Sequence, residues 1–217
     1  MKTDTQLQSD VTAALNWEPS LDATHIEVAV KEGVVTLLGA VASFTEKWAA
    51  DHSVKGVGGV QAVVNELEVR LPGASERTDS DIARAAVTAL EWTTSVPHDR
   101  IMLTVHDGAI TLEGSVDWAY QKTAAEEVVR QLMGVKGVRN QLVVEPKVVT
   151  PEISTQIAAA FQRSATLEAQ KIWVEAERGK VILRGNVHSW FERAEAERVA
   201  ASAPGVREVE NHISVTP

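Results

Sequence analysis

An internal repeat constrains the fold of this 217-residue chain more than any other feature. Two separate blocks each occur three times, at residues 33–39, 108–114 and 179–185 and at residues 59–65, 134–140 and 205–211. Both blocks shift by 75 positions from the first copy to the second, and by 71 from the second to the third. Because two blocks keep one offset, the chain consists of three copies of one unit rather than one large domain.

The repeat also sets the domain organisation. We predict domains at residues 1–70, 79–145 and 150–217, joined by linkers at residues 71–78 and 146–149. Proline and glycine near these junctions favour loops over helices or strands. Each unit of about 70 residues lies near the lower size at which one hydrophobic core supports folding.

The first helix of each copy is predicted from apolar residues spaced i, i+4, i+7 and i+8, which form one buried face. A small polar or acidic residue stands just before this face and is the expected N-cap of the helix. In copy three, Pro151 suits the first helical position. The expected N-caps are Asp4, Asp79 and Thr150, and the apolar face of copy one is Leu7, Val11, Ala14 and Leu15.

The remaining segments predict an α+β fold: three tandem α-β-β-α-β units, each a three-stranded mixed sheet with two helices on one face. Apolar residues alternate along the strands. Gly33, Gly108 and Gly179 mark tight turns between the first two strands, where glycine supplies a positive φ. The first two strands are then antiparallel. A right-handed β–α–β crossover makes the second and third strands parallel.

Composition excludes several classes of function. The chain has no cysteine, which excludes a disulfide scaffold, a thiol nucleophile and a thiolate metal site. Its formal charge of −9 argues against a broad nucleic-acid footprint. No apolar run approaches the roughly 18 residues that span a bilayer. The first residues lack the apolar segment of a signal peptide, so we expect a cytoplasmic protein as the sequence stands, and a periplasmic one if a leader was removed.

The stretch at residues 26–41, with Gly33 and Gly39, and its continuation at residues 59–67 resemble the BON domain, named after a bacterial osmotically inducible protein and a nodulation domain. Copy two resembles it nearly as well, and copy three keeps both glycines but is four residues shorter between Phe161 and Val174. The resemblance implies a non-enzymatic module, linked to the envelope or to osmotic stress, that contacts phospholipid. Some cytoplasmic relatives sense potassium.

The recurring glycines and asparagines allow two interpretations. Backbone N–H groups at the glycines could cradle an anion, and the asparagines could contact a ligand or an ion. More simply, one set of glycines serves the hairpin turns and the other ends a strand near a closely packed helix. The asparagines would then bond nearby backbone. The residues concerned are Gly33, Gly39, Gly108, Gly114, Gly179, Gly185, Asn65, Asn140 and Asn211.

Copy three holds the candidate contact surface. Residues 2–70 carry a net charge of −5 and residues 76–145 carry −4, whereas residues 148–217 carry only −1. Lys180 and Arg184 lie near the hairpin of copy three, with Trp173 beside Ile182 on the outer face of the sheet. Basic residues attract anionic headgroups, and tryptophan favours the membrane interface. We expect these four residues to contact a membrane or a ligand.

The sequence therefore favours a non-enzymatic module that binds phospholipid membrane surfaces. The alternatives are a protein that self-associates through apolar sheet faces, or a cytoplasmic potassium sensor. No histidine recurs between the copies, and no zinc spacing, nucleophile elbow or phosphate-binding loop is present. We expect no catalytic residues, no metal, no cofactor and no nucleic-acid partner.

Overall fold

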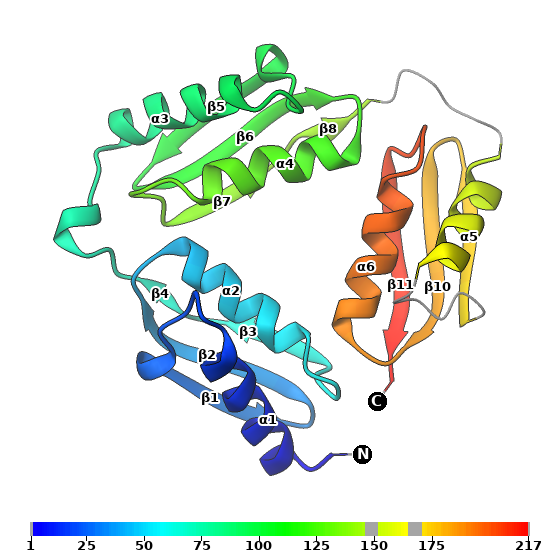
Figure 1. Ribbon diagram of the computed structural model, residues 1–217, viewed down its shortest axis with the longest axis horizontal. Coiled ribbons are helices and arrows are strands. Elements are labelled where there is room, and N and C mark those ends of the chain that lie inside the picture. The colour runs from blue at the N-terminus through cyan, green and yellow to red at the C-terminus, as the bar shows by residue number, and fades with distance from the viewer. Residues whose placement is uncertain (1, 146–151, 165–170, 217) are drawn as a thin grey trace. The chain divides into compact units, whose positions relative to one another are not determined.

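A computed structural model describes residues 2–145, 152–164 and 171–216 (Figure 1). Every copy has an α+β fold, with a mixed sheet and two helices packed on one of its faces. This confirms the predicted fold class. The proposed linker at residues 146–149 and the expected cap and first helical residue, Thr150 and Pro151, lie outside the described residues.

In copy one, β1 is antiparallel to β2, and β2 is parallel to the next two short strands. Copy two repeats this pattern. In copy one the elements are α1 (Asp4–Trp17), a 3-10 turn (Ala23–His25), β1 (Ile26–Lys31), β2 (Val34–Val41), α2 (Phe44–Lys55), β3 (Ala62–Asn65) and β4 (Glu68–Val69); in copy two, after a 3-10 turn at Gly73–Ser75, they are α3 (Asp79–Trp92), a 3-10 turn (His98–Arg100), β5 (Ile101–His106), β6 (Ala109–Val116), α4 (Ala119–Arg130), β7 (Gly137–Asn140) and β8 (Val143–Val144).

Copy three keeps the same order along the chain. Its strands lie in the order β11-β10-β9, with β9 antiparallel to β10. Its last strand is continuous, whereas in copies one and two the predicted last strand is divided into two pieces that both pair with the central strand. The elements are α5 (Ile153–Arg163), β9 (Ile172–Glu177), β10 (Lys180–Val187), α6 (Trp190–Ala201) and β11 (Glu208–Val215).

Each copy has a core between its helices and one face of its sheet. Leu7, Val11 and Leu15 of α1 are buried against Val35 and Leu37 of β2. The second helix of every copy contributes an alanine that is completely buried, so this helix lies close to the sheet. These alanines are Ala50, Ala125 and Ala196.

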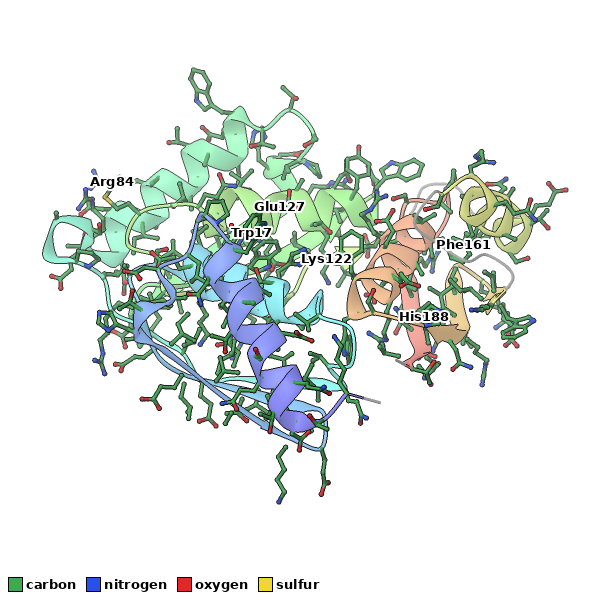
Figure 2. All side chains as sticks on the ribbon, turned by 60° about the horizontal axis from the view of Figure 1, so that its bottom comes forward. Trp17, Arg84, Lys122, Glu127, Phe161 and His188 are labelled. Carbon is green, nitrogen blue, oxygen red and sulfur yellow. The ribbon has the colours of Figure 1, made fainter. Side chains whose placement is uncertain are left out.

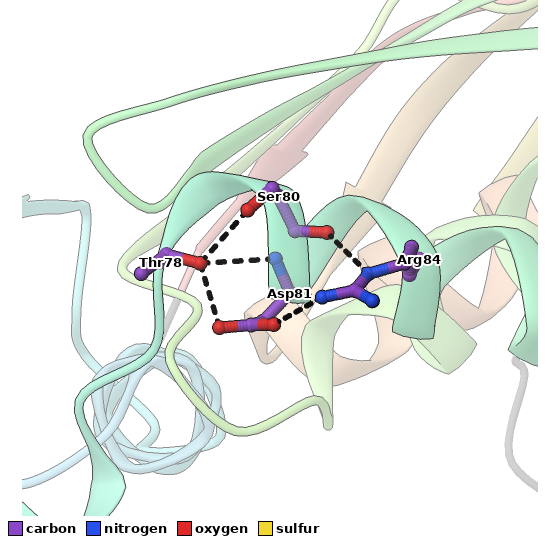
Figure 3. A network of polar contacts seen from close by, with 4 residues as sticks. All are labelled: Thr78, Ser80, Asp81 and Arg84. Atoms are coloured by element: carbon purple, nitrogen blue, oxygen red, sulfur yellow. Dashed lines mark hydrogen bonds and ion pairs between the residues drawn. The ribbon is translucent and has the colours of Figure 1, made fainter.

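The first helices of copies one and two begin one residue earlier than predicted. Thr3 Oγ1 accepts the backbone N–H of Gln6 at 3.3 Å, and Thr78 Oγ1 accepts that of Asp81 at 3.2 Å. At α3, Thr78 Oγ1 also bonds the Ser80 hydroxyl, and Arg84 donates to the Asp81 carboxylate (Figure 3). The threonines are therefore the N-caps. The prediction that Asp4 and Asp79 cap these helices was wrong, because both are first helical residues.

Candidate functional site

The hairpin glycines lie in two-residue turns with positive φ at both positions. Glu32 has φ 51° and Gly33 has φ 77°, and the turns at Gly108 and Gly179 repeat this geometry. Positive φ at both central residues matches the strand twist, as in type I′ turns. The turn geometry therefore favours glycine at the second position of each turn.

In two copies, an aspartate carboxylate of the protein accepts hydrogen bonds from the backbone N–H groups of the hairpin turn. Asp4 accepts the backbone N–H groups of Glu32 at 2.9 Å and of Gly33 at 3.3 Å. Asp79 accepts those of Asp107 and Gly108 in the same way, at 3.0 and 2.9 Å. In copies one and two, the anion that the hairpin amides could cradle is thus the protein's own aspartate. Sequence reasoning missed this role, although an acidic residue at the same place in both copies was its signal.

The second set of glycines lies against backbone rather than against a helix. Gly39 has φ 119°, and a Cβ there would collide with the carbonyl oxygen of His25, just before β1. Gly114 meets the carbonyl of Arg100 in the same way, and Gly185 meets that of Lys171. The expected helix contact was wrong: these glycines let the chain before the first strand cross close to the second.

The three asparagines brace the second helix to the last strand. Asn65 Nδ2 donates to Lys47 O at 3.2 Å, and its Oδ1 accepts Leu67 N–H at 3.2 Å. Asn140 and Asn211 make the same two contacts. In each copy the helix carbonyl lies 18 residues before the asparagine. The side-chain amide of each asparagine therefore bonds backbone groups of its own domain and stabilises the fold.

The four candidate residues of copy three share the outer face of its sheet, but their register differs from the prediction. Trp173 pairs with Arg184, and Ile182 pairs with Glu175. Trp173 is 63% exposed. Ile182 therefore lies diagonally from Trp173, and a carboxylate stands directly opposite it.

Carboxylates form ion pairs with the basic residues of this face. Lys180 Nζ lies 2.5 Å from Glu210 Oε1, and Arg184 Nε lies 4.0 Å from Glu175 Oε1. The hydrogen bond to Glu210 raises the pKa of Lys180 and lowers the pKa of Glu210. The attraction of this surface for anionic headgroups is consequently reduced.

Two tryptophans at equivalent positions are the most exposed large apolar side chains described. Trp17 is the last residue of α1 and is 88% exposed (Figure 2). Trp92 is the last residue of α3 and is 83% exposed. At the end of α5, copy three has Arg163 instead. Their equivalence was visible in the sequence, but their exposure depended on where the helix ends.

The described residues contain neither a candidate metal site nor a candidate membrane-spanning helix. No three His, Asp or Glu side chains there are placed to hold a metal ion together. In the same residues, no helix combines the length and the apolar character needed to cross a bilayer.

The family model of the BON domain matches the chain three times, at residues 3–70, 78–146 and 150–217. The chain belongs to the BON-domain family. This confirms the resemblance seen in its glycine motifs. The three matches account for nearly the whole length of this BON-domain protein.

The chain is similar in sequence to two named bacterial proteins. The BON-domain chain is 33% identical to osmotically-inducible protein Y of Escherichia coli over 145 residues, which is 64% of this chain and 71% of the relative. It is 29% identical to the outer membrane lipoprotein DolP of Haemophilus influenzae over 116 residues, which is 51% of this chain and 60% of the relative. One relative is thus named for osmotic induction and the other for the outer membrane.

A solved structure was also found by its shape. CdsD, a structural protein of the type III secretion system of Chlamydia trachomatis, aligns over 98% of this chain and 93% of its own with 14% identity and a TM-score of 0.26. A likeness this weak carries no argument about the BON-domain chain.

Proposed function

We propose that this chain is a non-enzymatic envelope protein that binds the surface of phospholipid membranes through the tryptophans at the ends of α1 and α3. The exposure of Trp17 and Trp92 at equivalent helix ends carries the proposal. Related proteins named for osmotic induction and for the outer membrane support it.

Tryptophan suits this role because its ring is apolar while its indole N–H remains a hydrogen-bond donor. The side chain therefore favours the boundary between headgroups and acyl chains. Moving part of one exposed ring from water into the membrane interface contributes about 1–2 kcal/mol. Trp17 and Trp92 have little contact with their own domains, so they can enter a membrane without unfolding.

The charge of the chain predicts which membranes it prefers. Copies one and two carry −5 and −4, so anionic headgroups repel them. Binding through tryptophan should then be at least as strong on zwitterionic vesicles as on anionic ones, and salt should not weaken it. Binding through Lys180 and Arg184, the surface predicted from the sequence, would show the opposite lipid and salt dependence.

Co-sedimentation with vesicles of phosphatidylcholine, with and without phosphatidylglycerol, tests the proposal. The double variant Trp17→Ala, Trp92→Ala should lose at least about tenfold in vesicle affinity. Trp173→Ala is the matched control, because it removes an exposed tryptophan from the sheet face of copy three. Both variants should keep the circular dichroism of the parent.

Two results would overturn the proposal: unchanged binding of the double variant, or no binding to either vesicle. If Trp173→Ala or Lys180→Glu with Arg184→Glu removes binding instead, the site lies on copy three.

Self-association is a second candidate function, favoured by the outer sheet face of copy one. Leu38 and Val64 are 37% and 42% exposed there. Val64 of β3 pairs with Thr36 of β2, which lies two residues before Leu38 on the same strand. Apolar residues on an open sheet face favour contact with another protein surface. Light scattering during size-exclusion chromatography tests this function. A dimer that Leu38→Glu dissociates supports it, and a strict monomer at high concentration contradicts it.

A further inference from the structure

Copy two has a groove beside the first strand of its sheet. Among the described strands, β5 pairs only with β6 and is an edge strand. α3 packs along β5, and between them lies a groove of about 600 Å³. Its apolar walls come from Ala83, Val87 and Leu90 of α3 and from Ile101 and Leu103 of β5.

A side-chain amide closes the same edge in copy one. Gln8 Nε2 donates to Val28 O at 2.7 Å, so the carbonyl of Val28 points outward from the sheet. The repeat offset places Ala83 and Leu103 at these two positions in copy two. Within the residues that the structure describes, no side chain donates to Leu103 O. Copy two therefore keeps the outward carbonyl but lacks the amide that binds it in copy one.

A second exchange makes the groove apolar. Thr12 of copy one corresponds to Val87 of copy two, which is 45% exposed. Copy three has Ser154 and Ala158 at the positions of Ala83 and Val87. Copy two thus combines small and apolar residues along α3 with the open edge of β5.

We propose that this groove binds an extended polypeptide segment, which adds as a strand to the edge of β5. The amide of Gln8 indicates the ligand chemistry, because a peptide N–H can donate to Leu103 O as that amide donates to Val28 O. Strand addition gives affinity through main-chain hydrogen bonds and specificity through alternate side chains. The apolar walls select small aliphatic side chains at alternate positions.

The charged residues that line the groove, Arg84 and Glu91, do not favour an acidic segment. Arg84 lines the groove, but its guanidinium bonds Asp81 Oδ1 at 2.6 Å and Ser80 O at 3.3 Å at the start of α3 (Figure 3). A carboxylate of the protein therefore already matches this cation. β5 has six residues, so a segment of similar length covers its edge.

The test uses the full chain and the acetylated, amidated peptide Ser-Val-Thr-Val-Thr-Val-Ser, without vesicles. Fluorescence polarisation measures affinity, and amide chemical shifts locate the site. The peptide should bind and shift the amides of β5 residues 101–106. Ala83→Gln, which restores the residue of copy one, should weaken binding by about tenfold. Ala85→Gln, on an exposed part of the same helix, should not change it.

A second peptide separates strand addition from adsorption to an apolar surface. N-methylation of alternate amides keeps the side chains but removes the donors along one edge, so this peptide should not bind. Equal binding of both peptides, equal effects of the two glutamine variants, or no binding of the unmodified peptide would each overturn the proposal. Because no lipid is present, the outcome is independent of membrane binding.

Discussion

The first two copies differ from the third at positions that do not hold the fold together. Copies one and two end their first helix in an exposed tryptophan, whereas copy three ends it in Arg163. Copy three instead has its exposed tryptophan, Trp173, on a sheet face with matched ion pairs. All three copies keep the asparagine that joins the second helix to the last strand, called the asparagine brace. They also keep the close glycine, which is Gly39, Gly114 or Gly185 and meets the carbonyl just before the first strand. One scaffold thus supports two kinds of surface.

The close glycine is expected to give the largest effect and to show how far the copies share a scaffold. In Gly114→Ala, the new Cβ would collide with Arg100 O at a φ of 123°. Copy two should lose about 3 kcal/mol or more. Amide hydrogen exchange should accelerate throughout copy two. Gly73→Ala is the control, because no atom lies within 4 Å of its new Cβ. Unchanged exchange in Gly114→Ala would contradict the close approach.

The asparagine brace should contribute similarly in unlike copies. Asn140→Ala removes the bond to Lys122 O and leaves Leu142 N–H without its acceptor. We expect a loss of about 1–3 kcal/mol in copy two, and the same from Asn211→Ala in copy three. Hydrogen exchange of the last strand measures both. If the two variants lose very different amounts of stability, the asparagine does not play the same part in copies two and three.

The helix end should be transferable between copies. Arg163→Trp gives α5 the final residue of α1 and α3. Vesicle affinity should rise by several fold, since an interfacial tryptophan contributes about 1–2 kcal/mol. Arg163→Ala is the matched control, because it removes the same charge without adding a ring. If both variants bind vesicles equally, charge rather than the ring explains the difference.

The ion pairs of copy three should give the smallest effect, and one that depends on pH. The pKa of Glu210 is lowered, so its pairing with Lys180 persists above the ordinary glutamate range and is lost as the pH falls through the lowered value. The pKa of Lys180 is raised, so its contribution is lost only as the pH rises through that raised value. Acidification therefore releases Lys180, and binding to anionic vesicles should increase slightly.

Glu210→Gln tests this release at neutral pH. It should raise binding to phosphatidylglycerol vesicles by a few fold without changing binding to phosphatidylcholine, since a released basic residue is attracted to an anionic surface. Lys180→Gln in the same background should remove the increase. An increase that survives Lys180→Gln would assign the effect to other charges.

The sequence was sufficient for the fold because two periodicities determine it. Helical spacing at Leu7, Val11 and Leu15 and alternation along the strands fix which face is buried. Backbone bonding is one of the two interpretations that the sequence allows for the asparagines, but the sequence does not identify the helix carbonyl as the partner, because that carbonyl comes from a different element.

Features that depend on distant partners were not predictable in this way. The aspartate contact with the hairpin joins Asp4 to residues 28 and 29 positions later, and the residue before β1 meets Gly39 only once the strands are paired. The position of Trp173 opposite Arg184 was predictable in principle. A two-residue turn at Arg178 and Gly179 fixes the register of the whole hairpin.

The asparagine brace also has a consequence for the order of folding. It closes a loop of only 18 residues between the second helix and the last strand. Pairing of β2 with β3 in copy one joins Val34 to Ala62 over a longer segment, which costs more chain entropy. Substitutions at the brace should therefore slow folding more than they speed unfolding, and each copy carries its own nucleus for this step.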